Sequence, residues 1–173
     1  FSKRYVDPTY LVNEPFDYIF PIGVFVNEKL ETIKKISNDL LLTYIQLHGN
    51  EDQDYINECK KLQVGGIIKA VGIESKEDIQ QAAAFNNIDY ILFDKKSVEH
   101  GGTGEKFDWT LLKFYEGETP FFLAGGIGPE DAEKISEINH PKFAGIDINS
   151  RFELSPGIKN IKQIKLFLEK ILQ

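Results

Sequence analysis

The sequence predicts an α/β fold, a (β/α)8 or TIM barrel with about six of its eight strands in this chain. Apolar runs rich in Ile, Val and Phe alternate along the sequence with segments whose apolar residues recur at helical spacing. Each run is apolar almost without interruption, which is typical of strands that are covered on both faces, as in parallel sheets. Polar residues and glycines gather where these runs end.

The apolar runs and the periodic segments give the expected elements in chain order. The predicted strands are residues 22–26, 44–47, 66–71, 90–93, 121–124 and 143–148. The predicted helices are residues 30–37, 55–62, 79–85, 111–115, 132–138 and 161–171. Ser75, Asp108 and Pro129 mark three helix starts, because residues of these types cap or open a first helical turn.

Strand-helix units of this kind form either an open doubly wound sheet or a closed barrel. An open sheet places its site at one switch point, whereas a barrel collects site residues from many strand ends. Here the residues that could take part in binding or catalysis follow nearly every expected strand. They are Gln46, His48, Asp94, Gly125, Gly126, Asp147, Asn149 and Ser150. This distribution favours the barrel, with residues 1–173 as a single domain.

Composition limits the class of protein further. The chain has 173 residues, of which 42% are hydrophobic and 27% charged, and its formal net charge is −7. Basic residues are scattered among acids, so the sequence offers no basic surface for nucleic acid or an anionic membrane. No apolar run approaches the roughly 20 residues that a membrane-spanning helix needs. We therefore expect a cytoplasmic protein without nucleic-acid or membrane partners.

Two glycines end the expected strand at residues 121–124. Gly125 and Gly126 leave backbone N–H groups open to close approach, because no Cβ atom blocks them. In barrels, the loops after the last two strands commonly bind a phosphate in this way, and Asn149, Ser150 and Arg151 follow the next strand. The pairing of these two loops predicts a phosphate site, although each loop alone is also typical of a plain turn.

Asp94 directly follows the apolar run at residues 90–93, so it lies at a strand mouth. Partial burial there suits a general acid, but an aspartate that forms a turn at a loop start has the same spacing. The loop that follows, Gly101 to Gly104, either folds over a ligand or is simply flexible. Asp108 is expected to be a helix N-cap, with Trp109 in the first turn.

Other polar residues have weaker signals. Gln46 and His48 alternate along one strand and so point to the same face, where a hydrogen-bonding or positioning role suits His48. His100 and His140 share no metal-ligand spacing with His48, so we infer no metal. Arg4 precedes the first expected strand. It is either a solvated surface charge or a residue whose planar guanidinium binds an anionic ligand.

In order along the chain, these residues resemble a known family. The motifs are Ser2-Lys3-Arg4-Tyr5, Gln46-Leu47-His48-Gly49, Ile68-Lys69-Ala70-Val71, Leu92-Phe93-Asp94, Gly101-Gly102-Thr103-Gly104 with Phe107-Asp108-Trp109, Leu123-Ala124-Gly125-Gly126, and Asp147-Ile148-Asn149-Ser150. Together they resemble phosphoribosylanthranilate isomerase of tryptophan biosynthesis, along essentially the whole chain. The resemblance implies a (β/α)8 barrel that carries out an Amadori rearrangement without a cofactor, as a monomer or homodimer.

The same resemblance implies a role for each site residue. Asp94 would be the general acid, and Arg4 would hold the substrate near it. Gln46 and Asp147 would contact the substrate. The position of His48 on the same strand face as Gln46 adds it to the expected substrate-binding residues. The phosphate would be bound by Gly125, Gly126, Asn149 and Ser150, with Arg151 beside them.

The chain departs from the family pattern at two places. The family's general base is a cysteine in a Lys-x-Cys-Gly pattern of the first strand, which these residues lack, and Cys59 lies in a helical segment instead. We therefore expect that a strand-helix-strand portion of roughly 30 to 40 residues, with the base, precedes Phe1 in the parent protein. The absence of Met fits this expectation. The second departure is Arg151-Phe152 in place of Gly-Val, so Arg151 either contacts the phosphate or points to solvent.

The sequence is also compatible with two other functions. Another phosphosugar isomerase or epimerase of the barrel class would need metal-binding His and Asp at several strand ends, and only His48 is available there. A barrel without catalytic activity could keep the phosphate site and lack the base.

Overall fold

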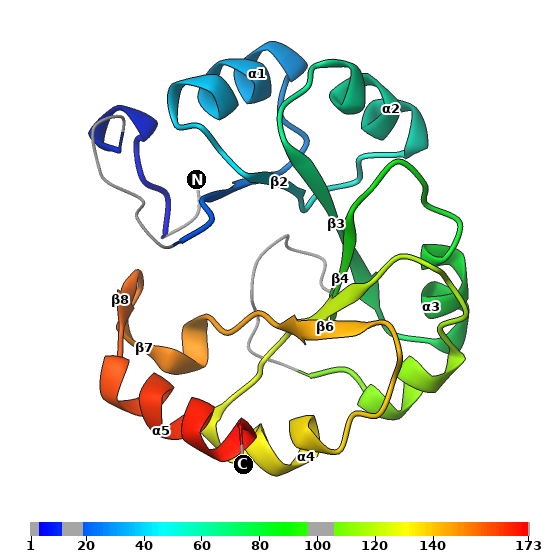
Figure 1. Cartoon of the computed structure of the whole chain (residues 1–173), viewed down its shortest axis with the longest axis vertical. Coiled ribbons are helices and arrows are strands. Elements are labelled where there is room, and N and C mark those ends of the chain that lie inside the picture. The colour runs from blue at the N-terminus through cyan, green and yellow to red at the C-terminus, as the bar shows by residue number, and fades with distance from the viewer. Residues whose placement is uncertain (1–3, 12–18, 97–105, 173) are drawn as a thin grey trace.

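The computed structural model describes residues 4–11, 19–96 and 106–172, so the Gly101 to Gly104 loop lies outside the described residues. Its main feature is a parallel sheet with the strand order β1-β2-β3-β4-β5-β6, in which each strand pairs with its neighbour in sequence. The strands are β1 (Ile22–Phe25), β2 (Tyr44–Leu47), β3 (Gly66–Ile73), β4 (Tyr90–Lys95), β5 (Phe121–Leu123) and β6 (Phe143–Ile146). They curve around a common centre with the helices outside (Figure 1), as expected for a barrel.

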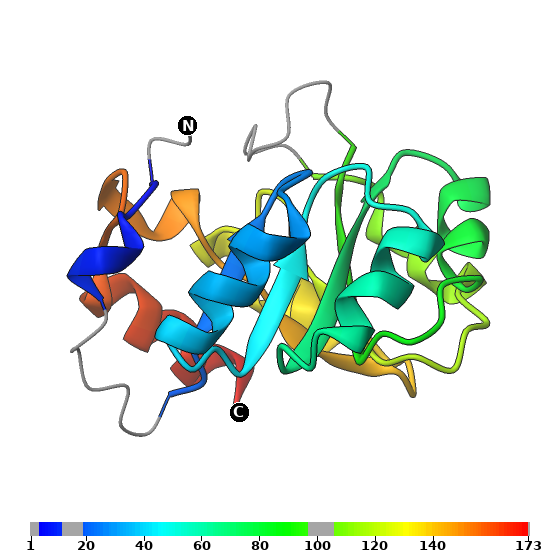
Figure 2. The same cartoon turned by 90° about the horizontal axis from the view of Figure 1, so that it is seen from above.

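The helices cover the outer face of this curved sheet, as both views show (Figures 1 and 2). The α-helices are α1 (Leu30–Asp39), α2 (Gln53–Lys61), α3 (Lys76–Ala82), α4 (Ala132–Ser136) and α5 (Ile161–Ile171). The described residues also form 3₁₀ helices: η1 (Pro8–Tyr10), η2 (Trp109–Phe114), η3 (Pro129–Asp131) and η4 (Ser150–Phe152). A small antiparallel pair, β7 (Glu153–Ser155) and β8 (Ile158–Lys159), precedes α5.

The predicted elements are confirmed with two differences. The segment between β4 and β5 was expected as an amphipathic α-helix, but it forms the 3₁₀ helix η2. The pair β7 and β8 was not expected, because strands of three and two residues give no periodic signal. Two helix starts are as predicted: Ser75 and Asp78 form a capping box at α3, and the Asp108 side chain accepts a hydrogen bond from Thr110 N–H at η2.

Apolar side chains fill the space on both sides of the sheet. Two clusters lie between the strands and the outer helices, one around Phe121 and one around Ile45. A third cluster occupies the inner face and includes Ile68, Leu92 and Ala124, with Tyr90 packed against it. Because both faces of each central strand are covered, the strands read as continuous apolar runs in the sequence.

Among the described residues, β1 and β6 each pair with one strand, so they are the two edges of the sheet. On β1, 46% of Ile22 and 60% of Val24 are exposed, although both residue types favour the interior of a sheet. The expected strand-helix-strand portion before Phe1 stays a prediction. None of the described helices is long and apolar enough to cross a membrane.

Phe121 offers a test of the outer core. Its ring is fully buried and lies 5.0 Å from the Phe93 ring, 5.5 Å from the Tyr115 ring and 5.1 Å from the His140 ring. We expect Phe121→Ala to lower the free energy of unfolding by about 3–5 kcal/mol, because the variant loses buried area and leaves a cavity. Phe20→Ala is the matched control, since 75% of Phe20 is exposed. Urea unfolding measures both, and equal losses would contradict this account of the core.

Candidate active site

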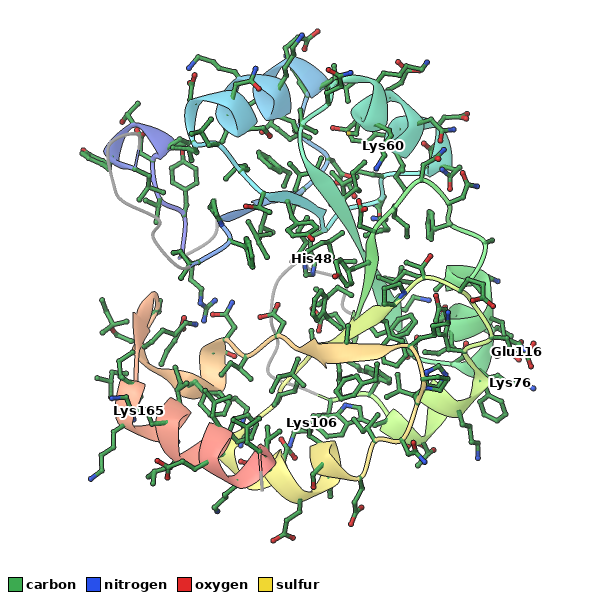
Figure 3. The ribbon with its side chains drawn as sticks, viewed as in Figure 1. His48, Lys60, Lys76, Lys106, Glu116 and Lys165 are labelled. Carbon is green, nitrogen blue, oxygen red and sulfur yellow. The ribbon has the colours of Figure 1, made fainter. Side chains whose placement is uncertain are left out.

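The carboxyl ends of the six parallel strands meet at one edge of the sheet, and the predicted site residues lie there. Hydrogen bonds align the strand ends: His48 N–H donates to Phe25 O, Ala124 N–H to Phe93 O, and Asp147 N–H to Leu123 O, each at 2.8 Å. His48 points toward the centre of the ring of strands (Figure 3). This end of a barrel is where the active sites of such enzymes lie.

His48 and Asp94 face each other across this mouth. His48 Nε2 lies 3.3 Å from Asp94 Oδ2, and the side chains are 23% and 19% exposed. On the other side of the ring, Gln46 Nε2 lies 2.8 Å from His48 Nδ1. With the amide nitrogen in that position, Nδ1 accepts, so the neutral ring carries its proton on Nε2 and directs it at Asp94. Gln46 thereby selects the tautomer of His48.

The Gly125-Gly126 turn lies against the same carboxyl group. Both glycines have left-handed backbone conformations, with φ values of 83° and 64°. A Cβ atom on Gly125 would lie 2.7 Å from Asp94 Oδ1 and 2.8 Å from Lys95 N. Position 125 therefore needs glycine for two reasons: the backbone is left-handed there, and Asp94 approaches too closely for a Cβ atom.

Asp147 lies at the end of β6 and is open to solvent in the mouth. Enclosure by the surrounding protein is the largest cause that raises the pKa of Asp147, and the negative charge of Asp94 raises it further. The charges of His48 and Lys159 act in the opposite direction. The Asp147 side chain is thus surrounded by protein atoms and still reaches solvent. Asp147 is therefore a carboxyl group that holds a proton more readily than an isolated aspartate.

Arg4 belongs to a charged cluster beside this mouth. Its guanidinium forms a two-pronged hydrogen bond to Glu153, with Nε 3.0 Å from Oε1 and Nη2 2.7 Å from Oε2. Lys159 Nζ lies 2.8 Å from Glu153 Oε1 and also binds the side-chain oxygen of Asn149. The hydrogen bond from Arg4 is the main cause that lowers the pKa of Glu153 to about 2. Arg4, Lys159 and Asn149 are thus connected through one carboxylate.

Arg151 pairs with a carboxylate of the neighbouring loop. Its Nη2 lies 2.7 Å from Glu130 Oε1, and Lys106 Nζ lies 3.1 Å from the same oxygen. A Cβ atom on Gly128 would lie 2.6 Å from Arg151 Nε. Arg151 therefore links the segment after β6 to the segment after β5, while 42% of its side chain stays exposed.

Cys59 has no place in this site. It is fully buried on α2, and desolvation raises the pKa of its thiol to about 11. The expected helical position of Cys59 is confirmed. In the described part of the chain, no group of three or more His, Cys, Asp or Glu side chains could hold a metal ion.

Several residues of the site region were not foreseen from the sequence. Lys159 lies in a two-residue strand with no motif, and its pairing with Glu153 depends on the turn at Pro156-Gly157. Lys69 carried a detectable signal, because a lysine interrupts an otherwise apolar strand. Its partner, Glu51, lies 18 residues earlier, and no sequence pattern marked Glu51 as that partner.

A ring of parallel strands whose mouth holds a carboxylate, a histidine and a glycine turn defines an enzyme of the (β/α)-barrel class. Comparison with known proteins gives the particular family. The profile of N-(5'-phosphoribosyl)anthranilate (PRA) isomerase matches residues 11–170. This chain belongs to that family.

Individual relatives agree with the family over nearly the whole chain. The N-(5'-phosphoribosyl)anthranilate isomerase of Parabacteroides distasonis is 44% identical, and the alignment covers 99% of this chain and 79% of that protein. A structure of monomers of the dimeric isomerase from Thermotoga maritima has a TM-score of 0.80 and 30% identity, with 99% and 82% of the two chains covered. An isomerase in complex with reduced 1-(o-carboxyphenylamino)-1-deoxyribulose 5-phosphate has a TM-score of 0.77 at 30% identity, with the same coverage. The barrel fold expected from the sequence is thereby confirmed.

Gly125→Ala tests the close approach at the mouth. We expect the variant to lose about 2–4 kcal/mol of unfolding free energy, because it combines an unfavourable left-handed conformation with a clash against Asp94. Gly157→Ala is the matched control: its φ is 85°, but no atom lies within 4 Å of the added Cβ. The control should lose only about 1–2 kcal/mol. Urea unfolding curves that coincide for the two variants would show that Asp94 does not crowd this position.

Glu153→Gln tests the charged cluster through its pH dependence. Because the pKa of Glu153 is lowered from 4.5 to about 2, its charge stabilises the folded state fully above pH 4.5, and this stabilisation is lost as the pH falls toward 2. We expect the variant to be less stable than the wild type by about 1–3 kcal/mol near pH 6. The difference should shrink steadily in urea unfolding at lower pH. A difference that stays constant down to about pH 2.5 would contradict the pairing.

Proposed function

We propose that this protein converts N-(5-phosphoribosyl)anthranilate to 1-(2-carboxyphenylamino)-1-deoxyribulose 5-phosphate, the Amadori rearrangement of tryptophan biosynthesis. Membership of the isomerase family supports this reaction. The observation that carries the residue assignment is the position of Asp94, between His48 and the Gly125 turn at the mouth of the barrel. We also propose a role for each residue of the site.

Asp94 is proposed as the general acid of the first step. Protonation of the ribose ring oxygen opens the ring and leaves a protonated Schiff base between C1 and the anthranilate nitrogen. The Asp94 side chain is 19% exposed, so it is partly enclosed yet reachable by a substrate. His48, with its Nε2 3.3 Å from Asp94 Oδ2, orients the carboxyl group by donating a hydrogen bond to it.

The second step needs a base that removes the proton from C2 and gives an enolamine, which then becomes the ketone of the product. Cys59 is unsuitable, because it is buried on α2 and its raised pKa keeps it in the thiol form. The family resemblance assigns this base to a cysteine in a Lys-x-Cys-Gly pattern, which these 173 residues do not contain. That assignment stays a prediction.

The charged groups of the substrate have complementary partners around the mouth. We assign the phosphate to the backbone N–H groups of Gly125 and Gly126 on one loop and to Asn149 and Ser150 on the next, with Arg151 beside them. Arg151 is 42% exposed and its partner Glu130 is 53% exposed, so this surface ion pair can rearrange around an anion. We assign Arg4 to substrate binding, together with Gln46, His48 and Asp147.

Two alternatives have less support. A metal-dependent epimerase would need a set of metal ligands, and the described residues contain no such group. A barrel that binds phosphate without catalysis would not require the ordered Gln46, His48 and Asp94 contacts.

A cytoplasmic location and assembly as a monomer or homodimer complete the proposal.

Asp94→Asn tests the proposed acid. Asparagine keeps the shape but cannot donate a carboxyl proton, so we expect kcat of the full-length protein to fall by about 10²–10⁴-fold. Binding of a product analogue should change by less than about threefold. The assay follows the fluorescence of phosphoribosylanthranilate as it is consumed.

Two controls define the outcome. Asp147→Asn should raise KM more than it lowers kcat, because Asp147 is assigned to binding. Asp39→Asn, on the outer face of α1, should leave both unchanged. Undiminished turnover in Asp94→Asn would refute the acid role, and a larger kcat loss in Asp147→Asn would transfer that role to Asp147.

A further inference from the structure

We propose that the buried pair of Lys69 and Glu51 is a positioning device that holds His48 against Asp94. This inference rests on the proposed function, since it assigns a purpose to the contact between His48 and the proposed acid. Neither Lys69 nor Glu51 is among the residues assigned to the substrate or to proton transfer.

The pair is buried more deeply than any other in the described part of the chain. The side chains of Lys69, in β3, and Glu51, in the loop before α2, are only 4% and 2% exposed, with Nζ 2.9 Å from Oε2. Burying two charges has a large desolvation penalty, and replacement of such a pair by neutral residues is often harmless to stability. Stability alone therefore gives a weak reason for a lysine inside this apolar strand.

The hydrogen bonds of Lys69 converge on the residue before His48 and the residue after it. Its Nζ donates to Leu47 O at 3.3 Å and to Gly49 O at 2.8 Å. One ammonium group thus fixes the carbonyls on both sides of His48. Ammonium groups have three donors, and the third is used by Glu51.

Glu51 fixes the same loop from the other direction. Its Oε2 accepts from Gly49 N–H at 2.8 Å, and its Oε1 accepts from Asn27 N–H at 2.7 Å at the end of β1. Burial by itself raises the pKa of Glu51, but the bonds from Lys69 and Asn27 more than offset it, so the net pKa is lowered. Glu51 is therefore an anion that ties β1 to the loop after β2.

These bonds leave His48 little freedom to move. Its own N–H is bound to Phe25 O, and its ring is held by Gln46 on one side and faces Asp94 on the other. Asn50 N–H also binds the Asn27 side chain at 2.8 Å, which closes the loop over the strand ends. Loss of the Lys69 bonds frees the backbone at 47–49 and shifts the imidazole relative to the acid. Misplacement by about 1 Å can reduce a rate by as much as 10²-fold.

The test separates positioning from stability with two variants. Lys69→Met removes the hydrogen bonds and leaves Glu51 as an unpaired buried charge, so both Tm and kcat should fall. The double variant with Glu51→Gln removes that charge, so its Tm should rise above that of the single variant. Its kcat should stay about 10-fold or more below the wild type, with KM changed by less than about threefold, because the carbonyl bonds are still missing.

Ile33→Ala provides a control that is destabilised but keeps every hydrogen bond of Lys69 and Glu51. Ile33 is fully buried on α1, so this variant should lower Tm while kcat, measured well below Tm, remains that of the wild type. The ring signals of His48 in NMR spectra should shift in the Lys69→Met variants and not in Ile33→Ala. Where Lys69→Met alone does not fold, the double variant carries the comparison, and Glu51→Gln, which retains the Lys69 carbonyl bonds, should lose less kcat than either.

The outcomes separate this inference from the proposed function. Recovery of kcat together with Tm in the double variant would overturn the positioning role, as would an equal loss of kcat in Ile33→Ala. Wild-type protein without turnover, or unimpaired Asp94→Asn, would instead contradict the proposed function. A low kcat at a recovered Tm, with displaced His48 signals, supports the positioning role.

Discussion

The parallel register of the six strands is the constraint on which the rest of this structure depends. Each strand pairs with its sequence neighbour in the same direction, so all carboxyl ends lie at one edge. His48 after β2, Asp94 in β4 and Gly125 after β5 are 46 and 31 residues apart in sequence, yet the register places them in contact. A shift of one residue in any pair would turn inward-facing side chains to the helices. The site is therefore a product of backbone pairing before it is a product of side-chain contacts.

Much of the fold could be predicted because burial on both faces leaves a simple record in the sequence. β2 and α5 lie where they were expected, since an apolar run between polar residues and a long amphipathic period have clear ends. The segment at η2 has helical spacing over only a few residues, too few to distinguish a 3₁₀ from an α-helix. β7 and β8 are short and mostly exposed, so they depend on contacts with each other that no local pattern predicts.

The site was predictable where chemistry coincides with strand ends, and not where it depends on pairing across the fold. Asp94, His48 and the glycine turn follow apolar runs, so their place was evident. Arg4 meets Glu153 across 149 residues, and nothing near either residue in sequence indicates the other. The sequence left open whether Arg151 contacts the phosphate or points to solvent. In the structure it pairs with Glu130 of the adjacent loop, a contact that the sequence did not indicate. Charged contacts of this kind are set by which strand ends are neighbours.

Because Cys59 is buried, its reaction with a thiol reagent can report on unfolding of this chain. Its thiol is fully buried where α2 packs on the sheet, and desolvation leaves very little of it as the reactive thiolate at neutral pH. An alkylating reagent can therefore reach it only when the packing of α2 on the sheet is broken. Labelling rates at this sulfur follow local or global unfolding directly, without a dye or an introduced probe.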